Sequence, residues 1–320
     1  MLRVSMALVA AFGSVAGAHA ATVVPTVYEA GHFFATPVTA SGQALKLLVD
    51  TGGGGRSLVV YGEAGRRKGL AESSCAGEKA FALPAFAPGK TLPASNRGCG
   101  MAGDVDWPAA AMEDGMVGAW YLSGFTVTFD YPGRRLTFED AKWRPAASAH
   151  SLALGLPINA KGELGSPFPR ITLTIDGEPL DVLLDTGATA HPTEAGLKAM
   201  GTPVVGGYGV TSYVTASVMD RWHARHPDWK LVKQADDLFG PDKTKRAIEV
   251  PQVIVGGWSV GPVWFTERPD ANFVEKMSAA MDDTVYGAAG GNLFRTFRMT
   301  IDYPGHKAYL ECVDACRAAN

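Results

Sequence analysis

One short stretch occurs twice in the chain and constrains the fold more than any other feature. Residues 41–52 read SGQALKLLVDTG and residues 176–187 read DGEPLDVLLDTG, which align without gaps. In both copies an apolar, strand-like run ends on Asp-Thr-Gly. Because the glycine permits a tight turn, each copy predicts a carboxylate at the edge of a buried strand.

A second pair of blocks follows in the same order. Residues 117–139 (VGAWYLSGFTVTFDYPGRRLTFE) align on residues 289–311 (AGGNLFRTFRMTIDYPGHKAYLE). The spacing between the blocks is longer in the second half, which indicates an insertion at roughly residues 212–250. A repeat near half the chain length predicts two similar lobes and not a solenoid.

The duplicated motif resembles that of aspartic proteases of the pepsin and retropepsin type, especially bacterial retropepsin-like domains. Met116-Val117-Gly118 and Ala288-Ala289-Gly290 are similar to the apolar-apolar-Gly turns of that family. The resemblance implies an all-β fold with two pseudo-symmetric β-barrel lobes, a cleft between them and minor helices. It also implies an aspartic endopeptidase that cuts peptide or protein substrates without a metal or cofactor.

The residues themselves support the expected fold class. The 38 Gly and 20 Pro, with many short β-branched runs, favour an all-β chain rich in turns. We expect a signal peptide over residues 1–20, an N-terminal lobe over 21–145, a linker over 146–165 and a C-terminal lobe over 166–320.

Several segments carry local strand signals, and one carries a helical signal. The insertion contains SVMDRWHARHPDWKLVKQADDLF, whose charged and aromatic residues recur at helical spacing, so we expect a solvated amphipathic helix over part of the sheet. The expected strands are residues 33–40 and 44–49 around Ser41-Gly42, 58–61, short stretches near Phe81 and Leu92, 125–130 and 135–139 around Tyr131-Pro132-Gly133, and 250–255 and 260–265 around Gly256-Gly257.

Asp50 and Asp185 are the candidate catalytic residues. Two carboxyls at hydrogen-bonding range cannot both ionise cheaply, so such a pair holds one shared proton. One member can then take a proton from water while the other donates a proton to a peptide carbonyl oxygen. By the family resemblance, the Thr51 and Thr186 hydroxyls bond across to the opposite lobe.

The glycines of the motif are candidate supporting residues. By the same resemblance, Gly52 and Gly187 let backbone amides approach the acids. Asp130 and Asp302 open the two Tyr-Pro-Gly turns and are expected to bond to turn backbone, not to act as catalytic acids.

Two alternatives stay open. The chain could be a non-catalytic protein that binds a peptide or a cell-wall ligand on the same fold, although two costly buried carboxyls count against that. The segment 206–214 (GGYGVTSYV) could form a mobile hairpin that places Tyr208 over the cleft, or it could be a plain surface turn. Because both halves are fused, we expect a monomer.

The start of the chain predicts export. Arg3 precedes an apolar run over residues 6–15, and Ala18-His19-Ala20 offers a cleavage site after Ala20. The run is shorter than a membrane-spanning helix needs, so we expect a periplasmic or secreted protein without a membrane span in its mature form. The 29 Lys and Arg nearly balance the 32 Asp and Glu, which predicts no nucleic-acid partner.

Four cysteines suit an oxidising compartment. Local pairing of Cys75 with Cys99 and of Cys312 with Cys316 is the simplest of the three possible connectivities. A metal site on these cysteines is disfavoured because no histidine follows at ligand spacing. In the insertion His223 and His226 lie three residues apart, but no third ligand stands at a recognisable spacing, so we expect no metal there either.

Overall fold

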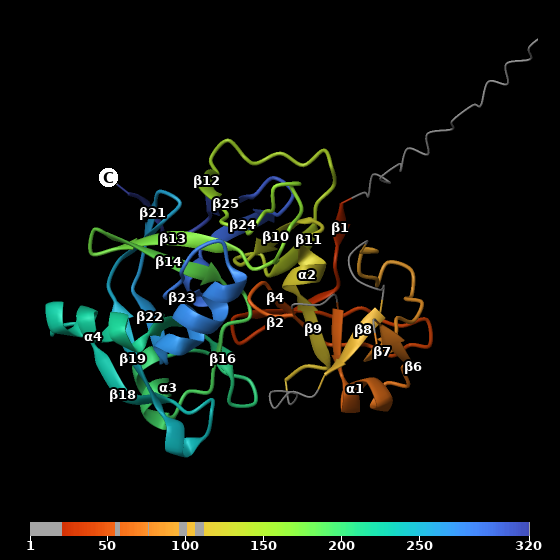
Figure 1. Cartoon of the computed structure of the whole chain (residues 1–320), viewed down its shortest axis with the longest axis horizontal. Helices are drawn as coiled ribbons and strands as arrows, with labels where there is room; N and C mark the ends of the chain where they lie inside the picture. Colours follow the sequence, from red (N-terminus) through yellow and green to blue (C-terminus); the bar gives the residue numbers. More distant parts are fainter. Residues whose placement is uncertain (1–20, 55–57, 76, 96–100, 106–111, 320) are drawn as a thin grey trace, which may run out of the picture.

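The computed structural model describes residues 21–54, 58–75, 77–95, 101–105 and 112–319 and is dominated by β-strands (Figure 1). Strand accounts for 42% of the structure and helix for 16%. The described strands form three large sheets and one two-stranded ribbon, none of which closes on itself. The expected all-β class with minor helices is confirmed, and the described sheets are open and do not close into the expected barrels.

The first half of the chain forms an eight-stranded sheet. Its central strand β4 reads LLVD and is buried along its whole length, as expected for a strand covered on both faces. In spatial order the sheet contains β2 (Thr26–Glu29), β3 (His32–Ala35), β4 (Leu47–Asp50), β9 (Gly115–Gly118), β5 (Leu58–Tyr61), β8 (Met101–Val105), β7 (Glu78–Ala82) and β6 (Glu72–Cys75).

The second half forms a ten-stranded sheet with an equivalent centre. In spatial order it contains β18 (Leu231–Asp236), β19 (Lys245–Val250), β22 (Val263–Arg268), β17 (Ser212–Thr215), β23 (Gly287–Ala289), β14 (Glu178–Leu184), β13 (Arg170–Ile175), β20 (Val253–Val255), β21 (Trp258–Val260) and β26 (Arg317–Ala318). The ribbon pairs β15 (Thr189–Ala190) with β16 (Gly209–Val210).

A six-stranded sheet joins the two halves. Its order is β1 (Thr22–Val23), β11 (Arg135–Phe138), β10 (Thr126–Asp130), β24 (Phe297–Asp302), β25 (Lys307–Cys312) and β12 (His150–Ala153). At its centre the hydroxyls of Thr128 and Thr300 bond at 2.8 Å, and these residues are 172 positions apart. They are equivalent in the second pair of repeated blocks, so an approximate twofold axis passes between them.

The helices are short and lie around the sheets (Figure 1). The longest, α4, begins the insertion and buries Val218, Met219 and Trp222, with the Trp222 ring 5.5 Å from that of Phe265. The helices are α1 (Gly62–Arg67), α2 (Ala119–Leu122), α3 (Glu194–Met200), α4 (Ala216–Arg225), α5 (Gly291–Phe294), the 3-10 segments Pro241–Lys243 and Ser278–Ala280, and the π-helix Ala271–Met277. No helix among the described residues is long and apolar enough to cross a membrane.

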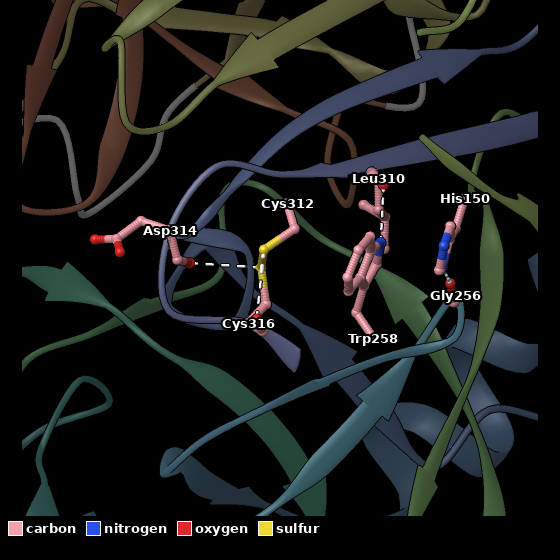
Figure 2. Close-up of a disulfide and its surroundings, with 7 residues drawn as sticks. All are labelled: His150, Gly256, Trp258, Leu310, Cys312, Asp314 and Cys316. Atoms are coloured by element: carbon pink, nitrogen blue, oxygen red, sulfur yellow. Dashed lines mark hydrogen bonds between the residues drawn. A yellow bond between two sulfur atoms is a disulfide. The ribbon is translucent and has the colours of Figure 1, made fainter. Parts of the chain in front are cut away.

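The C-terminal end is tied to the ten-stranded sheet, beyond a disulfide that Figure 2 shows. Cys312 and Cys316 form the expected local disulfide, and β26 then pairs antiparallel with β21. Trp258 donates its indole N–H to a backbone carbonyl of β25 at 3.0 Å, and its ring stacks on His150 with 4.2 Å between centroids. Cys75 is also disulfide-bonded, but its expected partner Cys99 lies outside the described residues.

Three local predictions differ from the structure. Leu92 is buried, but the residues around it form no strand. The hairpin around Gly256-Gly257 ends at Val260, because Pro262 has no N–H to donate to a ladder, and β22 is a separate strand. The insertion forms one α-helix and a 3-10 turn, and its remaining strands β18 and β19 form a hairpin that widens the sheet.

Candidate active site

Two equivalent strand arrangements carry the predicted acids. β4 ends at Asp50 and runs parallel to β9, with Asp50 opposite Gly118. In the second half β14 runs parallel to β23, and the Asp185 amide donates to the Ala289 carbonyl at 2.9 Å. A third strand, β5 or β17, pairs antiparallel with the other side of β9 or β23. Each acid stands at the end of a strand that has neighbours on both sides, β3 and β9 in the first half and β13 and β23 in the second.

The two threonines after the acids bond across the boundary between the halves. Thr51 Oγ1 donates to the Leu184 carbonyl at 2.6 Å and accepts from the Thr186 amide at 3.0 Å. Thr186 Oγ1 donates to the Val49 carbonyl at 2.8 Å and accepts from the Thr51 amide at 3.2 Å. Both threonines are buried. This reciprocal set of four bonds fixes one Asp-Thr-Gly loop relative to the other.

The fixed loops bring the two carboxyl groups together. Asp50 and Asp185 share a side-chain hydrogen bond and are only 7% and 8% exposed. Each carboxyl also lies against the glycine of the other half: a Cβ atom on Gly52 would lie 2.3 Å from Asp185 Cγ, and one on Gly187 would lie 2.3 Å from Asp50 Cγ. Only glycine leaves room for this approach.

Burial dominates the protonation of the pair. Burial raises the pKa of Asp50, although hydrogen bonds with Asp185 and with the backbone amides of Gly52, Gly53 and Gly187 lower it. Burial, the negative charge of Asp50 and their mutual hydrogen bond raise the pKa of Asp185 well above its usual range. The pair therefore retains a proton under conditions in which an exposed aspartate would be ionised.

Steric crowding also explains the two glycines that follow the first Asp-Thr-Gly motif, Gly53 and Gly54. A Cβ on Gly53 would lie 2.4 Å from Asp50 Oδ2. Gly54 has φ of +68°, and a Cβ there would lie 2.6 Å from the Cα of Gly118. Gly53 and Gly54 therefore permit a close packing of the loop against Asp50 and β9 that a side chain would prevent.

A buried network that the sequence did not reveal holds the loop after Asp185. The Arg268 guanidinium donates to Asp236 at 2.8 Å and to the Thr189 carbonyl at 3.3 Å, and it lies 4.2 Å from the Tyr213 ring centroid. The Tyr213 hydroxyl accepts from the Thr189 amide at 2.7 Å. These side chains come from three strands and meet only in the folded chain.

His32 reaches the same loop from the first half. Its Nε2 lies 3.3 Å from the Ala188 carbonyl and 3.2 Å from Thr189 Oγ1, while its buried Nδ1 has no hydrogen-bond partner. Burial lowers the pKa of His32 to about 4. His32 is therefore a neutral contact between the halves near neutral pH.

Tyr61 and Glu113 lie on the Asp50 side of the site, where the charge of Asp50 contributes to raising the pKa of both. The Tyr61 hydroxyl donates to Glu113 Oε1 at 3.1 Å, and both residues are buried. The sequence repeat could have identified Glu113. It aligns with the apolar Val285 of the second half, so an acid at this position departs from the repeat.

The Tyr208 segment packs between the halves. The Val210 amide donates to the Ala30 carbonyl at 2.9 Å, and Tyr208 packs against a cluster of the first half that includes Phe34 and Leu48. The segment forms a surface turn at Gly206-Gly207, and the residues that follow the turn are anchored between the two halves.

The histidines of the insertion, His223 and His226, lie away from Asp50 and Asp185. His226 bonds to Asp176 at 2.8 Å and stacks on Trp229 with 4.4 Å between centroids, while His223 Nδ1 is buried without a partner. Within the described ranges, no group of three or more potential metal ligands comes together. Asp130 and Asp302 accept the amides of Gly133 and Gly305, as expected of turn residues.

Comparisons with known proteins add a likeness at the level of structure. No protein-family model matches the sequence, and no curated protein matches it. One similar solved structure is a retropepsin-like aspartic protease from Rickettsia conorii, with 13% sequence identity and a TM-score of 0.29. The match covers 56% of this chain and 98% of that chain. A likeness of this size carries no information about activity, so the candidate active site rests on its own geometry.

Proposed function

We propose that the chain is an aspartic-type endopeptidase whose catalytic residues are Asp50 and Asp185. The observation that carries the proposal is the contact between two buried carboxyl groups, held by the reciprocal bonds of Thr51 and Thr186. Two acids buried face to face cost free energy, and a fold with no use for their chemistry would gain from losing one.

The shared proton gives the pair two roles. The ionised carboxyl accepts a proton from a water molecule as the water oxygen attacks the peptide carbonyl carbon. The protonated carboxyl donates its proton to the carbonyl oxygen, which gives a tetrahedral diol. Return of a proton to the amide nitrogen then lets the carbon–nitrogen bond break. No covalent bond to the protein forms, and the reaction requires no metal or cofactor.

The supporting residues keep this geometry. Thr51 and Thr186 hold the two loops at fixed separation, and Gly52 and Gly187 make room for the facing carboxyl. The amides of Gly52 and Gly187 also donate to the acid of their own loop, at 2.7 Å and 3.1 Å, which orients each carboxyl before substrate binds.

The division into lobes and the export of the chain belong to the same proposal. We place one lobe in residues 21–145 and the other in residues 166–320, joined by residues 146–165. Removal of residues 1–20 would release the chain to the periplasm or the medium, where the Cys312–Cys316 bridge is stable.

The test is hydrolysis of a denatured protein by the mature chain, measured from acidic to neutral pH. Asp50→Asn and Asp185→Asn each remove one of the two roles, so we expect either change to abolish cleavage. Asp302→Asn is the matched control, because Asp302 serves a turn, and it should cleave like the wild type. Undiminished cleavage by either of the first two variants would refute the mechanism.

A further inference from the structure

A third buried acid lies beside the pair. Glu113 stands just before β9 and is 7% exposed, the same fraction as Asp50. Tyr61 ends β5, and its amide donates to the Asp114 carbonyl at 2.9 Å. That backbone bond lets the Tyr61 hydroxyl reach Glu113 Oε1 at 3.1 Å. The acid is thus held by two neighbouring strands of the sheet centre, as the catalytic acid is.

A short chain of contacts links this acid to Asp50. Tyr61 belongs to a buried cluster against which Met116 packs. Met116 Sδ would lie 3.1 Å from a Cβ on Gly53, and the same Cβ would lie 2.4 Å from Asp50 Oδ2. The charge of Asp50 also contributes to raising the pKa of both Tyr61 and Glu113. Tyr61 and Met116 therefore lie between Glu113 and the loop that carries Asp50, on the side of the first half.

Glu113 forms no ion pair with any described residue, although cations lie close by. The Lys46 ammonium is already bound to Glu29 at 2.6 Å and lies 4.3 Å from the Phe34 ring centroid. The neighbouring acid Asp114 takes the other cations, Arg67 at 3.0 Å and Lys68 at 3.4 Å. Among the described residues, the charged and titratable groups that act on Glu113 are Tyr61, Lys46, Asp50 and Asp114, and none of these is a cation bound to its carboxyl.

The equivalent place in the second half is apolar. β17 pairs with β23 as β5 pairs with β9, which makes Thr215 the counterpart of Tyr61. The counterpart of Glu113 is Val285, which is fully buried. Val285 packs with Leu183, Phe273 and other apolar side chains. The two sides of the site therefore differ in chemistry: an unpaired acid on one and a hydrocarbon cluster on the other.

We propose that Glu113, held by Tyr61, forms a subsite that selects a basic side chain, lysine or arginine, in the peptide substrate. The inference rests on the proposed peptidase function and names its substrate class. A buried carboxylate without a counter-ion is costly, and a substrate ammonium or guanidinium supplies the missing charge. The apolar cluster offers no such partner, so the selection acts on one side of the scissile bond.

The test compares pairs of peptides that differ by one side chain. Each pair carries lysine or methionine, which are similar in length, at one position flanking a non-hydrolysable hydroxyethylene unit. Binding is measured by calorimetry above the Glu113 pKa of about 7, and cleavage of the matching hydrolysable peptides is measured in parallel. At one position the wild type should prefer lysine by about 10- to 100-fold, the usual effect of a charge-assisted hydrogen bond.

Three variants assign the preference to the acid. Glu113→Gln keeps the shape and removes the charge, so the ratio of lysine to methionine should fall to about 1. Tyr61→Phe keeps the acid and should retain the preference for lysine. Glu63→Gln makes the same chemical change at an exposed acid of the same half, and its ratio should equal that of the wild type.

The outcomes separate the two proposals. If the peptides bind or are cut without a preference for lysine at any position, or if Glu113→Gln keeps the preference, the subsite is refuted while the peptidase stands. If the wild type neither binds the analogues nor cuts any peptide, the proposed function itself fails, and the subsite fails with it.

Discussion

Replacing Thr51 by alanine should separate the role of its hydroxyl from that of its bulk. The change leaves the Leu184 carbonyl and the Thr186 amide buried without partners. Each such group costs about 1–3 kcal/mol, so the expected loss is about 2–6 kcal/mol. Thr51→Ser keeps both bonds and removes only a buried methyl group, which costs about 1 kcal/mol.

The assay is thermal unfolding followed by kinetics. At about 1.5–2 °C per kcal/mol for a chain of about 300 residues, Thr51→Ala should lower the melting temperature by at least about 3 °C, and Thr51→Ser by less. Peptide hydrolysis should fall in kcat for the alanine variant, because the acids lose their fixed separation. Equal melting temperatures and equal kcat for the two variants would show that the reciprocal bonds do not position the site.

Other changes test the buried charges and the C-terminal bridge. Arg268→Met leaves Asp236 buried without a cation and should destabilise the fold by about 3–5 kcal/mol in urea unfolding, whereas Arg268→Met with Asp236→Leu should recover most of the loss. Burial raises the pKa of Glu113 from 4.5 to about 7, so its contribution to stability is complete below pH 4.5 and is lost as pH rises through 7. Glu113→Gln should therefore flatten the dependence of melting temperature on pH in that range, and an unchanged slope would contradict the assignment. Cys312→Ser with Cys316→Ser removes a disulfide that closes a short loop, which should lower the free energy of unfolding by about 2 kcal/mol. Hydrogen exchange of the backbone amides should become faster in β26, while the amides of the Asp50 and Asp185 loops should remain protected.

The parts of the fold that sequence could predict are those encoded locally. Asp50 and Asp185 stand out because an apolar run and a turn glycine surround each one, and the pattern is present twice. The Tyr131-Pro132-Gly133 turn likewise defines its hairpin, since β10 and β11 pair directly across it. The Thr51 and Thr186 contacts followed only from a family resemblance, although the structure contains them.

The rest depends on contacts between distant segments. Tyr61 and Glu113 are 52 residues apart, and His32 and Ala188 are 156 apart, so no local pattern links either pair. β18 escaped prediction because it lies within the stretch whose charged and aromatic residues recur at helical spacing, and β19 lies beyond that stretch. Only the pairing of whole strands decides where such side chains finally lie.

The Thr128–Thr300 contact joins equivalent residues of one polypeptide across an approximate twofold axis, and this allows the two halves to differ in sequence. In a symmetric homodimer every substitution appears twice, so an acid at the position of Glu113 would be accompanied by its copy across the axis. Two extra negative charges would then flank a catalytic pair that already shares a proton. A single polypeptide escapes this doubling, and its halves can become unequal binding surfaces around a centre that stays balanced.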